Sequence, residues 1–174
     1  MVNAMPGMAA DPRLILSEEE LDRALEMFLL AEAAFWTAAD GVLDRLQAGV
    51  KPATGPRLGR GHFRAAFLLK RRPGLGVQEL ARLTGLSKQG ASRVLKELVE
   101  SGHAEALPGA LDARRRPTHL TPRGLAFEAE LSSALRALLA DAYREGGIDA
   151  APGARRILAA IAGPKLSSRR KDSL

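Results

Sequence analysis

The sequence predicts a mainly α-helical protein that carries one small β-hairpin. Hydrophobic residues make up 46% of the chain but aromatic residues only 4%, and the prevalence of Ala and Leu favours helix over sheet. Apolar residues recur at three- and four-residue steps near both ends of the chain, which is the period of an amphipathic helix. Only around residues 103–120 do two short segments flank a polar loop, as in a hairpin. The 174 residues suffice for one compact core per subunit.

The N-terminal part is expected to form one long helix. Residues 1–16 lack periodicity and are predicted to be a flexible arm. Ser17 and Glu20 have the spacing of a capping box at the helix start. The apolar stripe that follows consists of Leu21, Leu25, Phe28, Leu29, Phe35, Trp36, Val42, Leu43 and Leu46. The helix should end near Ala48, because glycines and prolines follow as far as Pro56.

The remaining elements are shorter and closely spaced. They are predicted in this order: a helix over 61–72 that buries Phe63, Phe67 and Leu68; a Pro73-Gly74 turn; a helix over 77–84; a Gly85-Leu86 turn; a helix over 87–101; a hairpin of 103–107 with 117–120; a helix from Thr121-Pro122 to about Arg144; and a helix over 152–161. Ser87 and Thr121 are the expected N-caps, because their hydroxyls accept from backbone N–H groups at a helix start. The basic tail, 163–174, is predicted to be disordered.

Positive charge is concentrated in the middle third of the chain. Residues 1–56 hold four Lys and Arg against nine Asp and Glu, residues 57–123 hold fourteen against five, and residues 124–174 hold eight against six, which gives net charges of −5, +9 and +2. A basic segment beside a more acidic one is typical of a surface that binds phosphate. By itself, this distribution suits an ordinary solvated surface equally well.

The helices over 77–84 and 87–101 have the features of a helix-turn-helix. Ala81 supplies a small side chain where two helices cross, and Gly85 tolerates the left-handed backbone of the turn. The residues expected to pack inward are Leu80, Leu86, Ala91, Val94 and Leu98. The outward residues, with Gln and Arg suited to base edges and Ser and Lys to phosphates, are Ser87, Lys88, Gln89, Ser92, Arg93 and Lys96.

The loop of the hairpin adds a second cationic feature. Asp112 is expected to stiffen it by pairing with Arg114 or Arg93. Arg114 would then lie at the tip, where a narrow minor groove attracts a guanidinium, and Arg115 and Arg116 would meet phosphates. A helix and a cationic hairpin at adjacent grooves indicate double-stranded DNA as the partner. The alternative is a set of solvated arginines on a loop.

Together these segments resemble the MarR family of winged-helix transcriptional regulators. The motifs that carry the resemblance are Leu80-Ala81 through Gly85-Leu86-Ser87, Val94-Leu95-Lys96-Glu97-Leu98 through Gly102, Asp112-x-Arg114, and Leu120-Thr121-Pro122-x-Gly124. Two further stretches, Gly59-Arg60-Gly61-His62 and Lys88-Gln89, resemble a PetP-like branch of that family. The resemblance implies a winged helix-turn-helix with N- and C-terminal dimerisation helices, a homodimer, the helix over 87–101 in the major groove and Arg114 in the minor groove.

The sequence departs from this family at two places. Gly90 and Ala91 stand where the family more often has Ser or Thr, so fewer contacts to the DNA backbone are expected there. Pro117 and His119 are unusual in the returning strand of the hairpin, and because Pro117 cannot donate to a strand ladder, partial pairing of the hairpin is expected.

Other functional groups are sparse. The resemblance implies a small-molecule effector, for which Trp36, His62 and Phe63 are candidate pocket residues, although a purely core role is the favoured interpretation of these rings. The chain has no cysteine, its histidines lack metal-ligand spacing, and no catalytic or nucleotide-binding constellation can be assembled. No metal, no cofactor and no enzymatic activity are therefore expected.

These observations predict a homodimeric, sequence-specific regulator of transcription, a repressor modulated by an effector, on a pseudo-palindromic DNA site. The alternatives are a protein-interaction module and a low-specificity architectural DNA binder. The predicted divisions are a flexible arm 1–16, an N-terminal dimerisation helix and loop 17–56, a DNA-binding lobe 57–121, C-terminal dimerisation helices 122–162 and a disordered tail 163–174. No membrane partner is expected, because no apolar run could cross a bilayer. Without a secretion signal, a cytoplasmic location is expected.

Overall fold

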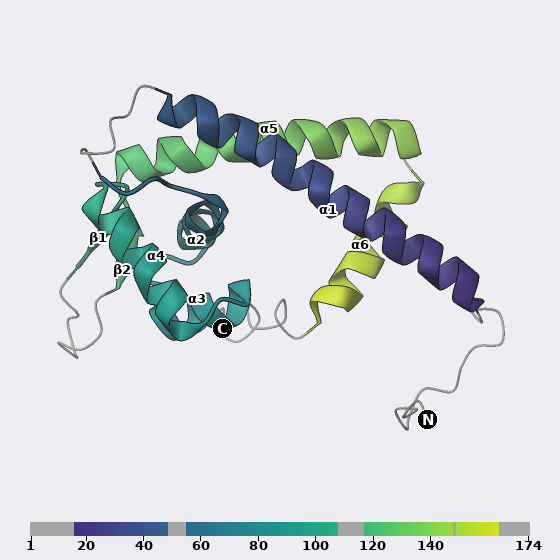
Figure 1. Cartoon of the computed structure of the whole chain (residues 1–174), viewed down its shortest axis with the longest axis horizontal. Coiled ribbons are helices and arrows are strands. Elements are labelled where there is room, and N and C mark those ends of the chain that lie inside the picture. Colours follow the sequence, from purple (N-terminus) through teal and green to yellow (C-terminus); the bar gives the residue numbers. More distant parts are fainter. Residues whose placement is uncertain (1–15, 49–54, 108–116, 148, 164–174) are drawn as a thin grey trace. The chain divides into compact units, whose positions relative to one another are not determined.

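A computed structural model describes residues 16–48, 55–107, 117–147 and 149–163 (Figure 1). Its elements are α1 (Glu18–Gln47), α2 (Arg60–Arg71), α3 (Val77–Thr84), α4 (Lys88–Glu100), β1 (Ala104–Ala106), β2 (Thr118–Leu120), α5 (Pro122–Gly146) and α6 (Ala150–Ala162). The predicted fold class, mainly helical with one small hairpin, is confirmed. The chain divides into two units between Phe35 and Trp36, inside α1.

Side-chain caps set the beginnings of three helices. At α1, the N–H of Ser17 donates to the Glu20 carboxylate at 2.7 Å and the N–H of Glu20 donates to the Ser17 hydroxyl at 3.2 Å. At α4, the N–H of Gly90 donates to the Ser87 hydroxyl at 3.0 Å. The Thr121 hydroxyl accepts from Gly124 in the same way at 3.2 Å, and Pro122 begins α5. The expected capping box and both expected N-caps are thus confirmed.

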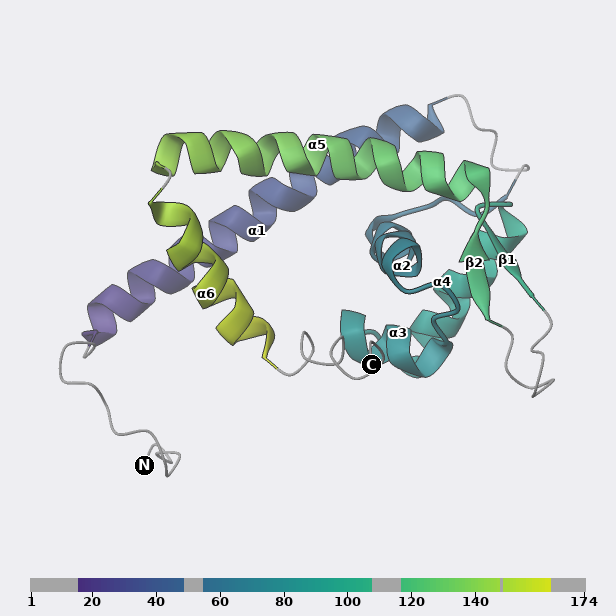
Figure 2. The same cartoon turned by 180° about the vertical axis from the view of Figure 1, so that it is seen from behind.

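The core of the second unit forms around α2. This helix contacts α3, α4, α5 and β2, and both views place it between α5 and the α3–α4 pair (Figures 1 and 2). The largest fully buried apolar side chains are Leu69, Leu80, Leu98 and Leu131. Because α2 is packed on several sides, its buried face also takes in Ala65 and Ala66.

Two details of the predicted core were wrong. Leu69 of α2 is buried, whereas Phe67 and Leu68, expected to be buried, are only half-buried. Leu95 of α4 is buried, whereas Leu86 and Val94, expected to pack inward, are only half-buried. The inward side of α4 is set by its contacts with α2, α3 and β1 together.

The hairpin pairs β1 and β2 antiparallel, with Ala104 opposite Leu120, Glu105 opposite His119 and Ala106 opposite Thr118. Pro117 precedes β2 and takes part as an acceptor, since the N–H of Leu107 donates to its carbonyl at 3.0 Å. The pairing is short, in line with the missing donor of proline.

The hairpin is also tied to the helices beside it. The N–H of Gly74, which has φ +83°, donates to the Thr118 carbonyl at 3.1 Å. The turn between α2 and α3 is therefore hydrogen-bonded to β2. At the other end, the N–H of Thr121 donates to the His103 carbonyl at 3.1 Å, and the Thr121 hydroxyl donates to the Gly102 carbonyl at 2.7 Å.

A buried carboxylate joins α2 to α5. Glu128 is completely inaccessible to solvent and accepts from the Lys70 ammonium, the Ser132 hydroxyl at 2.6 Å and the Arg71 guanidinium at 3.3 Å. Burial raises the pKa of the Glu128 carboxyl, but these three donors outweigh burial and hold that pKa below its usual value. The carboxylate is therefore ionised and paired.

Some large apolar side chains remain exposed. In the second unit these include Leu139 of α5 and Ile157, Leu158 and Ile161 of α6, and in the first unit Leu21, Leu25, Met27, Phe28, Leu29 and Leu30. Within the described residues, none of the helices combines the length and apolar character that a membrane crossing requires.

Candidate nucleic-acid interface

Helix α4 has one buried and one exposed face. Ala91, Leu95 and Leu98 are buried on the side that faces the core. The six residues predicted to contact DNA are all exposed: Ser87, Lys88, Gln89, Ser92, Arg93 and Lys96. The structure thus brings the predicted helix residues together on one solvent-facing surface.

The beginning of α4 is well formed and electropositive. Gly85, with φ +75°, ends α3 in the left-handed conformation that the turn requires. The Ser87 cap then starts α4, and its first turn contains Lys88 and no acidic residue. Lysine charge and the positive end of the helix dipole therefore coincide, which favours binding of a phosphate group.

Two basic residues of this face have acidic neighbours on the same helix. Arg93 Nε donates to Glu97 Oε1 at 2.9 Å, and Lys96 Nζ lies 3.4 Å from Glu100 Oε1. The side chains of Arg93 and Lys96 nevertheless remain 79% and 74% exposed. The pair of Lys96 with Glu100 is exposed on both sides, and such pairs stabilise a helix by only about 0.3–0.5 kcal/mol, so DNA could compete for Lys96.

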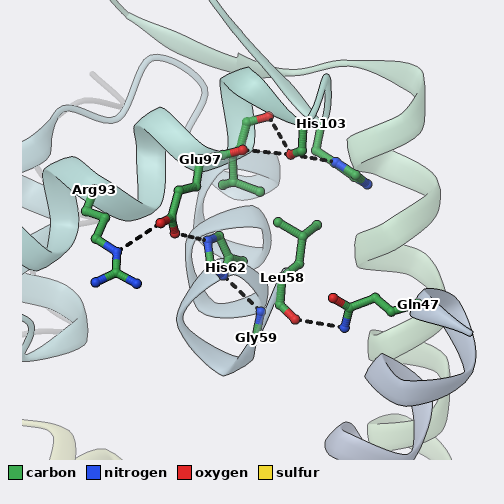
Figure 3. Close-up of polar contacts among 9 residues, drawn as sticks. Gln47, Leu58, Gly59, His62, Arg93, Glu97 and His103 are labelled. Atoms are coloured by element: carbon green, nitrogen blue, oxygen red, sulfur yellow. Dashed lines mark hydrogen bonds and ion pairs between the residues drawn. The ribbon is translucent and has the colours of Figure 1, made fainter. Parts of the chain in front are cut away.

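Glu97 has a second partner, which lies on α2 (Figure 3). Its Oε2 is 2.8 Å from His62 Nε2. Burial lowers the pKa of His62 below its ordinary value, although the Glu97 carboxylate partly opposes this effect. On the other side, the hydrogen bond from Arg93 lowers the pKa of Glu97.

The segment before α2 is held by polar contacts as well. The Gln47 side-chain amide donates to the Leu58 carbonyl at 2.9 Å, and the N–H of Gly59 donates to His62 Nδ1 at 2.9 Å. Figure 3 shows these contacts in one region, with Glu97 between His62 and Arg93. The end of α1, the start of α2 and the exposed face of α4 are therefore connected by hydrogen bonds.

The three candidate pocket residues are all buried, at 7% exposure for Trp36, 7% for His62 and 4% for Phe63. The guanidinium carbons of Arg60 and Arg64 lie 5.4 and 4.5 Å from the centre of the Trp36 ring. A role of these rings in binding a ligand stays a prediction. Asp112, Arg114, Arg115 and Arg116, the predicted residues of the hairpin loop, lie outside the described residues.

Comparison with known proteins decides the family. The profile of the MarR family matches residues 57–115. The HTH-type transcriptional regulator PetP of Rhodobacter capsulatus is 35% identical over 153 residues, which cover 88% of this chain and 86% of PetP. The chain belongs to the MarR family. MarR-family proteins are DNA-binding regulators of transcription without enzymatic activity, and the predicted resemblance, including its PetP-like branch, is confirmed.

Solved MarR-family structures share the fold. A MarR-family regulator from Rhodococcus sp. RHA1 superposes with a TM-score of 0.67 at 15% identity, covering 85% of this chain and 99% of that one. Rv2887 of Mycobacterium tuberculosis, a MarR-family protein in complex with DNA, gives 0.56 at 22% identity, covering 76% and 92%. The same protein with p-aminosalicylic acid gives 0.58 at 22% identity, covering 79% and 97%.

Sequence reasoning missed Glu97 as a member of this site. Its position four residues after Arg93 is a readable signal for an ion pair on one helix. Its contact with His62 joins residues 35 positions apart on different helices, and no local pattern indicates such a contact. Within the described residues there is no group of three or more His, Cys, Asp and Glu that could hold a metal ion.

Proposed function

We propose that this MarR-family protein is a homodimeric, sequence-specific DNA-binding repressor that a small molecule modulates. The observation that carries the proposal is the exposed face of α4, where six polar or basic residues stand opposite three buried apolar ones. The net charge of +9 over residues 57–123 supports a polyanionic partner. A cytoplasmic location is part of the proposal, because in bacteria such as Rhodobacter capsulatus, the source of the relative PetP, chromosomal DNA lies in the cytoplasm.

In this proposal α4 enters the major groove. Gln89 and Arg93 contact base edges, while Ser87, Lys88, Ser92 and Lys96 contact phosphates. Rv2887, a protein of the same fold, has been solved in complex with DNA, which supports DNA as the partner. The hairpin loop lies beside it, with Arg114 in the minor groove, Arg115 and Arg116 at phosphates and Asp112 stiffening the loop.

Selection of duplexes from a randomised library, followed by anisotropy titration, tests sequence-specific binding. The wild type should prefer the selected duplex over a scrambled one, and its affinity should fall steeply with salt. Gln89→Ala should change the selected sequence, whereas Arg136→Ala, which removes an exposed charge from α5, should not. Equal affinity for the selected and scrambled duplexes would instead favour an architectural binder, and no affinity for either would favour a protein-interaction module.

The proposed role of Arg114 has its own test. Arg114→Ala should weaken binding to the selected duplex by about 1–3 kcal/mol if this guanidinium occupies a groove. The charge-matched Arg136→Ala variant again serves as the control. Unchanged affinity of Arg114→Ala would exclude the minor-groove contact.

Exposed apolar side chains support the homodimer. Leu158 of α6 is 50% exposed and Ile157 and Ile161 exceed 60%, and a second copy of the chain would remove such a surface from water. A two-fold pair of α4 helices would bind a pseudo-palindrome with half-sites about one DNA turn apart.

The effector is proposed to bind near Trp36, His62 and Phe63. Rv2887 with p-aminosalicylic acid supports an aromatic acid as the first compound to test. We expect p-aminosalicylic acid to raise the melting temperature and to reduce DNA affinity, and Trp36→Leu to weaken both effects. A reporter gene behind the selected duplex would measure the sign of regulation, and expression that rises with the protein would exclude repression.

A further inference from the structure

His62 joins the start of α2 to α4 through both of its ring nitrogens (Figure 3). Nδ1 accepts the N–H of Gly59 at 2.9 Å, and Nε2 lies 2.8 Å from Glu97 Oε2. A backbone N–H can only donate, so Nδ1 carries no proton and Nε2 is the donor to the carboxylate. His62 is therefore a neutral ring with a fixed tautomer, and at 7% exposure it has little freedom to move.

Glu97 is held by this ring on one side and holds Arg93 on the other. Its Oε1 accepts from Arg93 Nε at 2.9 Å. The side chain of Glu97 is 19% exposed and that of Arg93 79%. An exposed arginine is thus fixed, through a half-buried carboxylate, to a buried histidine of another helix.

Glu100 offers a comparison on the same helix. It pairs with Lys96 at 3.4 Å and its side chain is 49% exposed. Among the described residues it has no partner on α2. The two pairs share their spacing along α4, and only the Arg93–Glu97 pair is anchored to another helix.

We infer that His62 and Glu97 are positioning residues for Arg93, and that Arg93, so held, binds one guanine of the DNA site through its two Nη groups. Because Nε is engaged by Glu97, the guanidinium is fixed in direction. Figure 3 shows both Nη nitrogens on the side away from Glu97. The inference rests on the proposed function, and adds which side chain selects a base and what keeps that side chain in place.

Guanine is the base that fits two adjacent donors. In the major groove it presents the acceptors O6 and N7 side by side. Adenine presents N7 beside an amino donor, so one Nη group would face another donor. A guanidinium held in direction therefore discriminates G·C from A·T at one base pair of each half-site.

Two substitutions of His62 separate its two hydrogen bonds. His62→Asn keeps an acceptor for the N–H of Gly59 and loses the donor to Glu97. His62→Gln keeps a donor toward Glu97 and loses the acceptor at Gly59. In titrations of the full chain against the selected duplex and single G·C to A·T changes, His62→Asn should lose about tenfold of its discrimination at one pair. His62→Gln should retain it.

Glu97→Ala provides a second variant, with Glu100→Ala as its matched control. Each removes one carboxylate four residues after a cation of α4, so both should raise general DNA affinity by a similar factor. Only Glu97→Ala should lose discrimination, at the same base pair as His62→Asn. Because Glu97 is only half-buried, this variant remains informative if His62→Asn is unstable.

A double-mutant cycle with Arg93→Ala completes the test. Arg93→Ala should abolish discrimination at that pair, and adding His62→Asn should cause no further loss. If His62 had a merely structural role, His62→Asn would cause the same loss of DNA binding in the wild type and in the Arg93→Ala variant.

The inference is overturned if the wild type binds a specific sequence but His62→Asn weakens all duplexes equally. It is also overturned if His62→Gln loses as much discrimination as His62→Asn. A wild type that prefers no sequence overturns the proposed function and this inference with it. The two failures are thus distinguishable.

Discussion

Gly124 fixes the junction between the hairpin and α5 by having no side chain. A Cβ atom at this position would lie 1.9 Å from the His103 carbonyl oxygen and 2.9 Å from its carbonyl carbon. That carbonyl also accepts the N–H of Thr121 at 3.1 Å, so it cannot move aside without losing a hydrogen bond. The Leu120-Thr121-Pro122-x-Gly124 motif therefore requires glycine at position 124 for a steric reason.

We expect Gly124→Ala to lower the free energy of unfolding by about 1–3 kcal/mol, because a backbone atom must shift to admit the methyl group. Gly41→Ala is the matched control. A Cβ there would have its nearest contact at 3.9 Å, so helix propensity should make that variant neutral or up to about 1 kcal/mol more stable. Urea denaturation measures both, and equal stability of the two variants would contradict the steric explanation.

The two buried histidines make stability depend on pH. Burial lowers the pKa of His62 and of His103 below the ordinary value. At a pH near the ordinary histidine pKa of about 6.5, these two side chains bind more protons in the unfolded chain than in the folded chain. Their contribution to the free energy of unfolding is therefore fully present above that pH and is lost as the pH falls below it.

Urea denaturation at pH 7.5 and pH 5.5 should therefore give a lower stability at the acidic pH. His62→Gln should reduce this difference, because its side chain does not titrate. His119→Gln is the comparison, because His119 lies on β2 and is not one of the two buried histidines. A difference that is equally large in the wild type and in His62→Gln would exclude a contribution from His62.

At the scale of helices, the contact between α2 and α5 depends on one carboxylate. Glu128 has no exposure and three donors around it, two of them cationic. Removing it leaves these donors without their acceptor, but Lys70 and Arg71 are 37% and 33% exposed and can turn toward water. The cost is therefore below that of breaking a fully buried pair.

Glu128→Ala should reduce the free energy of unfolding by about 1–3 kcal/mol. Glu130→Ala removes an exposed acid from the same helix and should change it by less than about 0.5 kcal/mol. Thermal or urea denaturation compares the two. If both variants were equally stable, the carboxylate would not join the helices as described.

The helices themselves could be predicted from local patterns. Caps such as Ser87 and Thr121 and the periodicity of apolar residues determine where helices begin and run, and these signals lie within a few residues of one another. Which side of a helix is buried depends on neighbours distant in sequence, so Leu95 was not assigned to the core. For the same reason, local patterns did not indicate the partners of Glu128, Arg71 and Lys70, which lie 57 and 58 positions away.

The candidate site was predictable to a similar extent. The exposed face of α4 follows from its buried residues, because both repeat with the helical period. The His62–Glu97 contact depends on how α2 packs against α4, and therefore required the fold.

At the scale of the whole molecule, the exposed apolar side chains of α6 provide a test of the proposed homodimer. Ile157, Leu158 and Ile161 of α6 are 63%, 50% and 62% exposed. Light scattering after size exclusion should give a dimer for the wild type. We expect Leu158→Glu to shift it toward monomer, because a charge buried without a partner opposes association.

Ala159→Glu introduces the same charge at an exposed position on the opposite side of α6, and should remain dimeric. DNA affinity should fall in the Leu158→Glu variant alone, because a monomer binds only one half-site. A wild type that is monomeric at micromolar concentration would contradict the proposed assembly.

The hydrogen bond from Gly74 to Thr118 has a consequence for how such a protein could respond to a signal. β2 is hydrogen-bonded to the α2–α3 turn, and β1 contacts α4. The two strands of the hairpin are therefore expected to move together with α4 as one rigid unit. In the proposed homodimer, an effector would then change the distance between the two rigid units, one in each copy. The contacts of each unit with its own half-site would stay the same. The length of each half-site would stay constant, and the effector would change only which spacing between two half-sites the proposed homodimer fits.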